Sequence, residues 1–450
     1  MPEQATIALS QVLAALSTAL DLTEGQPAGH AVRTCAIGCR IAEELGLSAA
    51  DRSALYYVLL LKDAGCSSNA ARFAALFGTR DQEAKHRMKL VDWQRRGKLA
   101  LRTFTTVARG GTFADRIRAF VSIARTEDVT RQLIQIRCDR GAEIVAQMGF
   151  PAATCDAIRT LDEHWNGGGH PNGARGEDIP LLARIANIAQ TAELYFSAQG
   201  LRAALDAVRS RRGSWFDPQL ADIVLGWRRD CAWWKTLAAP DIEALVVSLE
   251  PTGHIRRVDD SGLDAVARAF ADIIDAKSPY TFRHSSNVAK YALGIADACG
   301  LDAPEKRRLY RAGLLHDVGK LGISSRILDS PARLSDEERR EVERHPLFTW
   351  EILRRVGAFQ SFGWMASTHH EKLDGSGYPW GLDGASLDQS ARILVVADIY
   401  EALTADRPYR AGMTHDAAMD ILRRERGTKL CSEAIDGLEV WAGERVRVVA

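Results

Sequence analysis

The sequence predicts an all-α protein made of two tandem helical domains, and two observations carry this prediction. The first is helical periodicity along nearly the whole chain, as in residues 263–274 (LDAVARAFADII), where apolar residues recur at three- and four-residue steps. Ser335 and Glu338 form a capping box that starts another helix. Alternating strand patterns are almost absent, although residues 392–396 could form a short strand between helical stretches.

The second observation is an internal repeat, which gives the domain organisation. Two pairs of segments are related by an offset of 254, and two later pairs by an offset of 208: 60–65 with 314–319, 29–47 with 283–301, 163–173 with 371–381, and 183–190 with 391–398. The offsets differ by 46 residues, so we expect an insertion near 70–130 in the first copy. We therefore predict related domains at 1–250 and 255–450.

Composition excludes several classes of partner. Lys plus Arg number 58 and Asp plus Glu number 58, so no basic excess indicates a nucleic acid polymer or an anionic membrane as partner. The N-terminus lacks the basic start of a signal peptide, and the longest apolar run, 54–61, is too short to span a bilayer. The eight scattered cysteines form no CxxC pair, as expected in a reducing compartment. We expect a cytoplasmic protein without a membrane partner.

Histidines and aspartates accumulate in the second copy in the pattern of a polynuclear hydrolytic metal site. The series, with one lysine among them, is His284, His316, Asp317, Lys320, His345, His369, His370 and Asp398. Mixed imidazole and carboxylate groups suit Fe, Mn or Zn better than Mg or Ca. An Asp beside a His can bridge two metals about 3.5–4 Å apart. Lys320 follows His316 by four positions, so we expect both on one helix face.

These residues lie in four strings that resemble the HD-GYP subgroup of the HD phosphohydrolase superfamily over about residues 260–440. The strings are HDVGK (316–320), RHP (344–346), HHEKLDGSGYP (369–379) and DIYEALTADRPYR (398–410). The resemblance implies an all-helical fold and metal-dependent hydrolysis of cyclic di-GMP, or of a related cyclic dinucleotide, to a linear dinucleotide such as pGpG.

The resemblance also implies roles for individual residues. The metal ligands would be His284, His316, Asp317, His345, His369, His370 and Asp398. Asp317 and Lys320 would be catalytic, with Asp317 orienting the nucleophile and Lys320 contacting phosphate. Substrate contacts would come from Lys320, Gly377, Tyr378, Arg407 and Arg410, where each arginine offers a planar fork for phosphate or a guanine edge. Glu371 and Asp374 are interpreted either as partners that orient the histidines or as residues that stabilise the loop.

One position departs from the family pattern. Some members place a Glu four residues before the first His and hold three metals, whereas this chain has Tyr280 there. We therefore expect two divalent metals, Fe or Mn with Zn as the next candidate. The hypothesis for the reaction is attack of metal-activated water on phosphorus, with charge on the phosphoryl oxygens stabilised by Lys320.

The first copy lacks most of the corresponding metal ligands. Position by position, the second copy's site residues correspond to His30, Lys62, Asp63, Cys66, Arg137, Leu161, Asp162, His170 and Gln190. Lys62 and Arg137 place positive charge where a cation would bind, so we expect this domain to be catalytically inactive. A regulatory or scaffold role is the main interpretation, and nucleotide binding without hydrolysis stays open.

Two other functions remain alternatives. The chain could be a phosphohydrolase acting on another nucleotide or phosphate ester, or a signalling adaptor whose HD-GYP half mainly binds partners. A homodimer and a signalling-protein partner are both open.

Overall fold

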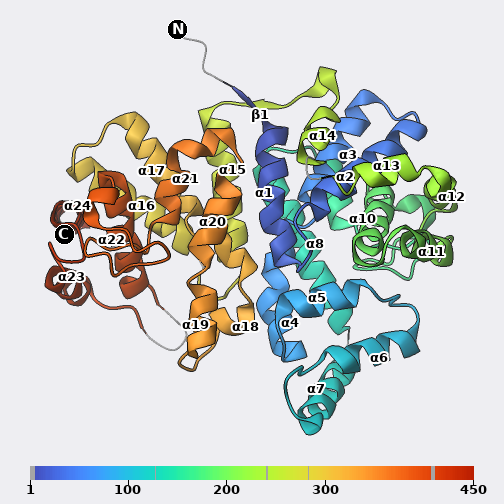
Figure 1. Cartoon of the computed structure of the whole chain (residues 1–450), viewed down its shortest axis with the longest axis horizontal. Helices are drawn as coiled ribbons and strands as arrows, with labels where there is room; N and C mark the ends of the chain where they lie inside the picture. Colours follow the sequence, from blue (N-terminus) through green and yellow to red (C-terminus); the bar gives the residue numbers. More distant parts are fainter. Residues whose placement is uncertain (1–5, 127, 240–241, 282, 407–410, 450) are drawn as a thin grey trace. The chain divides into compact units, whose positions relative to one another are not determined.

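The computed structural model describes residues 6–126, 128–239, 242–281, 283–406 and 411–449. The described chain is almost entirely helical, which confirms the all-α prediction (Figure 1). Its two strands are only two residues long: β1 (Ile7–Ala8) pairs antiparallel with β2 (Arg257–Val258), with Ile7 opposite Val258. None of the described helices has the length and apolar character needed to cross a bilayer.

The chain divides into two compact units. The first unit comprises residues 1–262 and 324–326, and the second unit comprises 263–323 and 327–450. The helices up to residue 248 are α1 (Leu9–Thr23), α2 (His30–Glu44), α3 (Ala49–Leu61), α4 (Ala70–Phe77), α5 (Asp81–Lys89), α6 (Arg96–Thr106), α7 (Phe113–Arg125), α8 (Val129–Gln147), α9 (Ala152–Arg159), α10 (Leu181–Gln199), α11 (Leu201–Arg211), α12 (Pro218–Gly226), α13 (Cys231–Thr236) and α14 (Ile242–Ser248). Within this unit, α2 packs against α3 and α10, and the stretch expected to be an insertion forms α4 to α7.

The remaining helices are α15 (Asp260–Asp275), α16 (His284–Ala298), α17 (Ala303–Leu315), α18 (Ser325–Leu328), α19 (Asp336–Val342), α20 (His345–Leu353), α21 (Gln360–Ser367), α22 (Gln389–Thr404), α23 (His415–Arg424) and α24 (Ser432–Val449). In the second unit, α16 lies at the centre and packs against α17, α22 and α24. Gly313 of α17 allows close approach to α16, because a Cβ there would lie 2.7 Å from the Ala289 Cα.

Local sequence signals account for two of these elements. Ser335 and Glu338 form the predicted capping box at the start of α19. The run at 392–396, which could have been a strand, is helical and lies within α22. Ile393 to Val396 are all buried, and a short apolar run that is buried on all sides has the same pattern in a helix as in a central strand.

Candidate metal centre

The predicted ligands of the second unit lie at the ends of helices that meet in its interior. His284 and His345 are the first residues of α16 and α20, His316 directly follows α17, and His369 follows α21 by two residues. Asp398 lies in the middle of α22. All of these side chains are buried, and His370 is about three-quarters buried. Residues that are far apart in the sequence therefore supply one compact set of donor atoms.

Asp317 lies at the centre of this set, and each of its carboxylate oxygens faces a different group of ligands. Its Oδ2 lies 3.3 Å from Nε2 of His284 and 3.3 Å from Nε2 of His316. The Nε2 atoms of His284 and His316 are 3.3 Å apart, and Oδ1 of Asp398 lies 3.4 Å from Nε2 of His284. His284, His316 and Asp398 therefore form one candidate metal position together with Oδ2 of Asp317.

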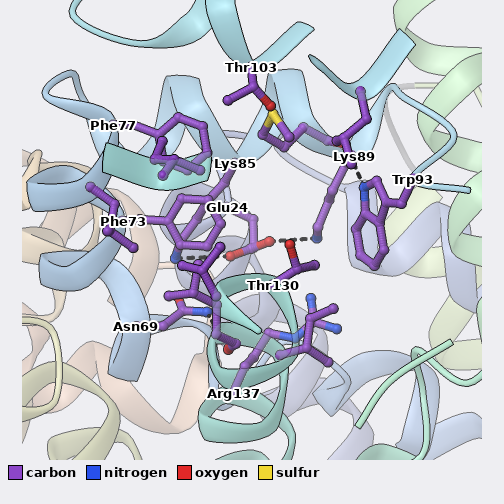
Figure 2. Close-up of a pocket in the computed structure, with 17 residues that line it drawn as sticks. Glu24, Asn69, Phe73, Phe77, Lys85, Lys89, Trp93, Thr103, Thr130 and Arg137 are labelled. Carbon is purple, nitrogen blue, oxygen red and sulfur yellow. Dashed lines mark hydrogen bonds and ion pairs between the residues drawn. The ribbon is translucent and has the colours of Figure 1, made fainter. Parts of the chain in front are cut away.

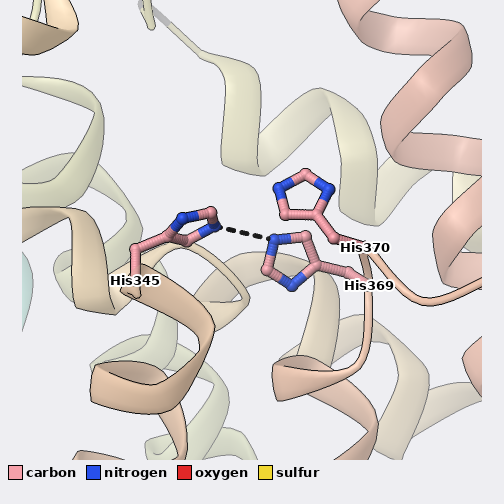
Figure 3. A group of neighbouring side chains, drawn as sticks. All are labelled: His345, His369 and His370. Carbon is pink, nitrogen blue, oxygen red and sulfur yellow. Dashed lines mark hydrogen bonds between the residues drawn. The ribbon is translucent and has the colours of Figure 1, made fainter. Parts of the chain in front are cut away.

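The other oxygen of Asp317 faces His345 and His369. Oδ1 lies 3.3 Å from His345 Nε2 and 3.6 Å from His369 Nε2. The Nε2 atoms of His345 and His369 are 3.1 Å apart, and the ring of His370 lies beside them (Figure 3). These three histidines form a second candidate position, because one ligand atom of each lies within 4.8 Å of the others.

Backbone carbonyls fix which ring nitrogen of each histidine points into the site. Nδ1 of His316 lies 2.8 Å from the carbonyl oxygen of Gly313. Nδ1 of His345 lies 2.7 Å from that of Val342, and Nδ1 of His369 lies 2.8 Å from that of Ala366. Since a carbonyl oxygen only accepts, Nδ1 carries the proton in each ring. The lone pair is then on Nε2, which is the tautomer a metal requires.

Glu401 anchors His284, and the sequence analysis missed this residue. The Glu401 carboxylate accepts a hydrogen bond from Nδ1 of His284, which leaves Nε2 facing Asp317. Glu401 is 2% exposed, so the contact is shielded from water. The available signal was its place in the DIYEALTADRPYR string, three residues after Asp398 and therefore on the same face of a helix.

The electrostatics of the site favour neutral imidazoles at His345, His369 and His370, a protonated His284 and a charged Asp317. Burial lowers the pKa of His345 and His369 below the usual value, and it lowers the pKa of His370 to about 3. Burial also opposes protonation of His284, but hydrogen bonds to Asp317, Asp398 and Glu401 outweigh it and raise its pKa. His316 and Lys320 hold the pKa of Asp317 well below its usual value despite burial.

The donor set fits divalent metal ions. Asp317 Oδ1 is fully buried and has no hydrogen-bond partner in the described parts of the chain, because the nearby Nε2 atoms carry lone pairs. A buried anionic oxygen surrounded by nitrogen lone pairs is unfavourable unless a cation lies between them. Borderline metals such as Fe, Mn and Zn accept this mixture of imidazole and carboxylate.

Lys320 lies beside Asp317, but the expected shared helix face is wrong. The helix α17 ends at Leu315, and residues 318–322 form a 3₁₀ turn in which the Lys320 ammonium contacts Asp317 Oδ2. Close packing at Gly319 explains the change of backbone, because a Cβ there would lie 1.9 Å from the His345 carbonyl oxygen.

The predicted substrate contacts are partly described. The Tyr378 ring lies beside His370, with ring centroids 4.7 Å apart. Gly377 packs on its own loop, because a Cβ there would lie 2.4 Å from Glu371 Cα. Arg407 and Arg410 lie outside the described residues.

Glu371 and Asp374 stabilise the loop. The carboxylate of Glu371 accepts hydrogen bonds from the backbone nitrogens of Trp380 at 2.8 Å and Leu382 at 2.9 Å. Asp374 accepts from Ser376. The same brace occurs in the first unit, where Glu163 accepts from the backbone nitrogens of Asn172 and Ala174 at 2.6 and 3.0 Å.

Side-chain cations occupy the corresponding site of the first unit. The Lys62 ammonium lies 3.1 Å from His30 Nε2 and contacts the Asp63 carboxylate. The Arg137 guanidinium, in the position that corresponds to His345, forms an ion pair with Asp162. The repeat thus keeps the helical frame while an ammonium and a guanidinium lie among residues that correspond to metal ligands.

Comparison with known proteins identifies the family. A family model described as HD domain matches residues 122–220 and 268–433. The chain is 40% identical over 437 residues to 3′3′-cGAMP-specific phosphodiesterase 3 of Vibrio cholerae, covering 97% of this chain and 95% of that protein. It is 38% identical over 151 residues to the cyclic di-GMP phosphodiesterase response regulator RpfG of Xanthomonas campestris, covering 32% of this chain and 39% of that protein.

A solved structure is similar over the same extent. The crystal structure of a cyclic GMP-AMP specific phosphodiesterase of V. cholerae, V-cGAP3, aligns with a TM-score of 0.67 and 36% identity over 98% of both chains. The chain therefore belongs to the HD domain family. Within that family it is an HD-GYP phosphodiesterase, an enzyme that hydrolyses phosphodiester bonds.

Proposed function

We propose that the second unit hydrolyses a cyclic dinucleotide at a centre of two divalent metals. The observation that carries the proposal is Asp317, whose two oxygens face two separate groups of imidazole and carboxylate donors. One ion would bind to His284, His316, Asp317 and Asp398, and the other to Asp317, His345, His369 and His370. Bound metals of this kind lower the pKa of water and so supply a nucleophile at neutral pH. Fe or Mn is our first choice for the ions, with Zn next.

The chain's own residues have separate roles in this proposal. Asp317 holds both halves of the centre in register and orients the nucleophile. The Lys320 ammonium, which contacts Asp317 and is partly exposed, stabilises negative charge on the phosphoryl oxygens. Tyr378 and Gly377 form the wall beside His370, and Arg407 and Arg410 complete the substrate contacts.

The extent of the similarities favours 3′3′-cGAMP over cyclic di-GMP as the substrate. The relative named for 3′3′-cGAMP matches almost the whole chain, including the first repeat, whereas the cyclic di-GMP phosphodiesterase RpfG matches 32% of it. With two metals, we expect the product to be the linear dinucleotide. A cytoplasmic location, a homodimer and a signalling-protein partner remain predictions from the sequence.

The test is an anaerobic purification followed by elemental analysis and chromatography of products from 3′3′-cGAMP and cyclic di-GMP. The native chain should contain about two metals per chain and release the linear dinucleotide, faster from 3′3′-cGAMP. Replacing His316 and Asp317 by Ala should abolish both metal content and turnover. The matched control is Asp336→Ala with Glu337→Ala, two exposed residues of α19, which should change neither.

Three outcomes would contradict the proposal. Turnover that survives the double replacement would refute the centre. A metal-loaded chain that cleaves only other phosphate esters in a substrate panel would support the alternative phosphohydrolase. A loaded chain inert towards every phosphodiester, but retained by a signalling protein, would support the adaptor.

A further inference from the structure

The first unit contains a cavity of about 150 Å³ beside its cation-filled site. Apolar side chains form most of its wall, among them Phe73, Leu76 and Phe77 of α4, Ile123 of α7 and Leu133 of α8. The stretch that the repeat marks as an insertion thus encloses a space that nothing in the catalytic proposal uses. An engineered cavity of about this size in another protein binds benzene, so the space suits a body as large as one aromatic ring.

Three side-chain cations lie around Glu24 in the lining of this cavity (Figure 2). Lys85, Lys89 and Arg137 all contribute to the lining. The single carboxylate of Glu24 lies between the two ammonium groups, 3.1 Å from Lys85 and 2.6 Å from Lys89. Burial opposes the charge on Lys89, but Asp63 and Glu24 raise its pKa, so it stays protonated.

The cations of this region are already paired with buried carboxylates. Lys85 and Lys89 contact Glu24, Lys62 contacts Asp63, and Arg137 contacts Asp162. Glu193, which is fully buried, contacts His30 beside Lys62 and adds a fourth negative charge to the four cations. The ammonium groups also fill the space around Glu24, Asp63 and Cys66, so that cluster does not favour a metal.

Besides Oε1 of Glu24, which has only its ion pair with Lys85, two buried polar atoms of the lining lack hydrogen-bond partners within the described part of the chain. They are Oδ1 of Asn69, a residue 3% exposed whose amide nitrogen donates to the Leu133 oxygen, and Nε of Arg137, a residue 8% exposed. Buried polar groups are nearly always hydrogen-bonded, so both atoms require a partner that the protein does not supply. Arg137 Nε needs an acceptor, which an anionic group provides.

We infer that the first unit binds a small organic anion, of the class of an aromatic or short-chain carboxylate, in this cavity. The apolar body would lie against Phe73 and Phe77, and the carboxylate would face Lys89 and Arg137. A cavity of about 150 Å³ is too small for a cyclic dinucleotide, so this ligand is chemically distinct from the proposed substrate. The inference does not depend on the reaction proposed for the second unit.

Ligand-observed fluorine NMR on the full-length chain tests the inference with three probes that share a fluorophenyl ring. We expect saturable 1:1 binding of 4-fluorobenzoate, weaker binding of neutral fluorobenzene, and no binding of cationic 4-fluorobenzylamine. Lys89→Met removes the charge at similar side-chain volume. It should lower the affinity for 4-fluorobenzoate roughly tenfold or more, because a charge-assisted hydrogen bond is lost. The control Lys235→Met, at an exposed position of α13, should leave the affinity unchanged.

A second pair of variants tests the location. Ile123→Trp fills the cavity from a half-buried position of α7 and should abolish binding of both 4-fluorobenzoate and fluorobenzene. Val121→Trp, on the exposed side of the same helix, should leave binding intact. Circular dichroism melting of each variant checks that the first unit remains folded.

Several results would overturn the inference. Absence of saturable binding by the native chain refutes the site. Equal affinity for 4-fluorobenzoate and fluorobenzene, with no effect of Lys89→Met, shows a merely apolar cavity. Binding that persists in folded Ile123→Trp assigns the probe to another place. Because Lys89→Met leaves the volume unchanged, the charge requirement is testable even if the tryptophan variant does not fold.

Discussion

The carboxylate of Glu401 accepts a hydrogen bond from Nδ1 of His284 and so directs the opposite ring nitrogen towards Asp317. The same pair exists in the first unit, where Glu193 contacts Nδ1 of His30. There the opposite nitrogen faces the Lys62 ammonium. Both units thus have the glutamate–histidine hydrogen bond between two helices. The group that faces Nε2 of the histidine differs, because it is Asp317 in the second unit and Lys62 in the first.

Replacing Glu401 with Gln should weaken metal binding about 10- to 100-fold. The amide oxygen can still accept from Nδ1 of His284, but it cannot polarise the ring as a carboxylate does. Titration of the metal-free chain with Mn²⁺, followed by calorimetry, measures the effect. Glu337→Gln, at an exposed position of α19, serves as the control. An unchanged affinity in Glu401→Gln would show that the contact only stabilises the fold.

Lys320→Met should reduce kcat about 100-fold or more while the metal content stays the same. The ammonium contacts an oxygen of Asp317 and is about one-fifth exposed, so it can act on substrate without being a ligand. Elemental analysis and single-turnover kinetics separate the two effects. Lys290→Met, at an exposed position of α16, should behave like the native chain. Loss of metal in Lys320→Met would instead assign the lysine to maintaining the centre.

Gly319→Ala should reduce both stability and turnover. The added Cβ would lie 1.9 Å from the His345 carbonyl oxygen, which forces α20 away from Asp317. We expect a loss of at least about 1–3 kcal/mol in the free energy of unfolding, as for other overpacked sites. Urea unfolding and activity are the measurements. Gly357→Ala is the matched control, because a Cβ there meets nothing within 4 Å. Native activity in Gly319→Ala would contradict this packing.

Lys62→Met should destabilise the first unit by about 3–5 kcal/mol, the usual cost of removing one partner of a buried ion pair. Lys62 is 1% exposed and contacts both Asp63 and His30. Urea unfolding measures the change, with exposed Lys235→Met as reference. An unaltered unfolding curve would mean that Asp63 is compensated by other groups.

Because Asp21 is buried, we predict that it makes the stability of the folded chain depend on pH. Burial raises its pKa to about 8, against the favourable charge of Lys62 and the hydrogen bond from the Ala31 nitrogen. The folded state therefore holds a proton that the unfolded state releases near pH 4. The resulting stabilisation is complete below about pH 4 and is lost as the pH rises through about 8.

Asp21→Asn keeps the acceptor oxygen but has no proton to lose. The melting temperature of this variant minus that of the native chain should thus rise between about pH 4 and 8 and level off above about pH 8. Melting curves by circular dichroism in that range test this. Asp416→Asn, at an exposed position of α23, should give a flat difference. A flat difference for Asp21→Asn would show that the carboxyl is charged in the folded chain.

The donor residues of the centre could be read from the sequence because they lie in short strings. Asp317 follows His316 directly, and His369 precedes His370, so local order already indicates a bridging carboxylate and a histidine pair. The repeat likewise indicated that Lys62 and Arg137 would place positive charge in the first copy. These inferences need only residue type and spacing.

Contacts between distant helices could not be read in this way. Glu401 and His284 are on α22 and α16, and no local pattern links them. The turn after His316 was predicted as helix because a four-residue spacing says nothing about Gly319 packing on a neighbouring backbone. The cavity of the first unit depends on side chains from α4, α7 and α8 that meet only after folding.

Because of the Lys62 ammonium and the Arg137 guanidinium, the two halves of this chain differ in their need for external metal ions. The first half carries cations covalently in positions that correspond to metal ligands of the second half. In the metal centre proposed for it, the second half requires ions from outside the chain. Removal of metal ions would therefore leave the cations of the first half in place, whereas the buried Asp317 of the second half would lose its charge compensation.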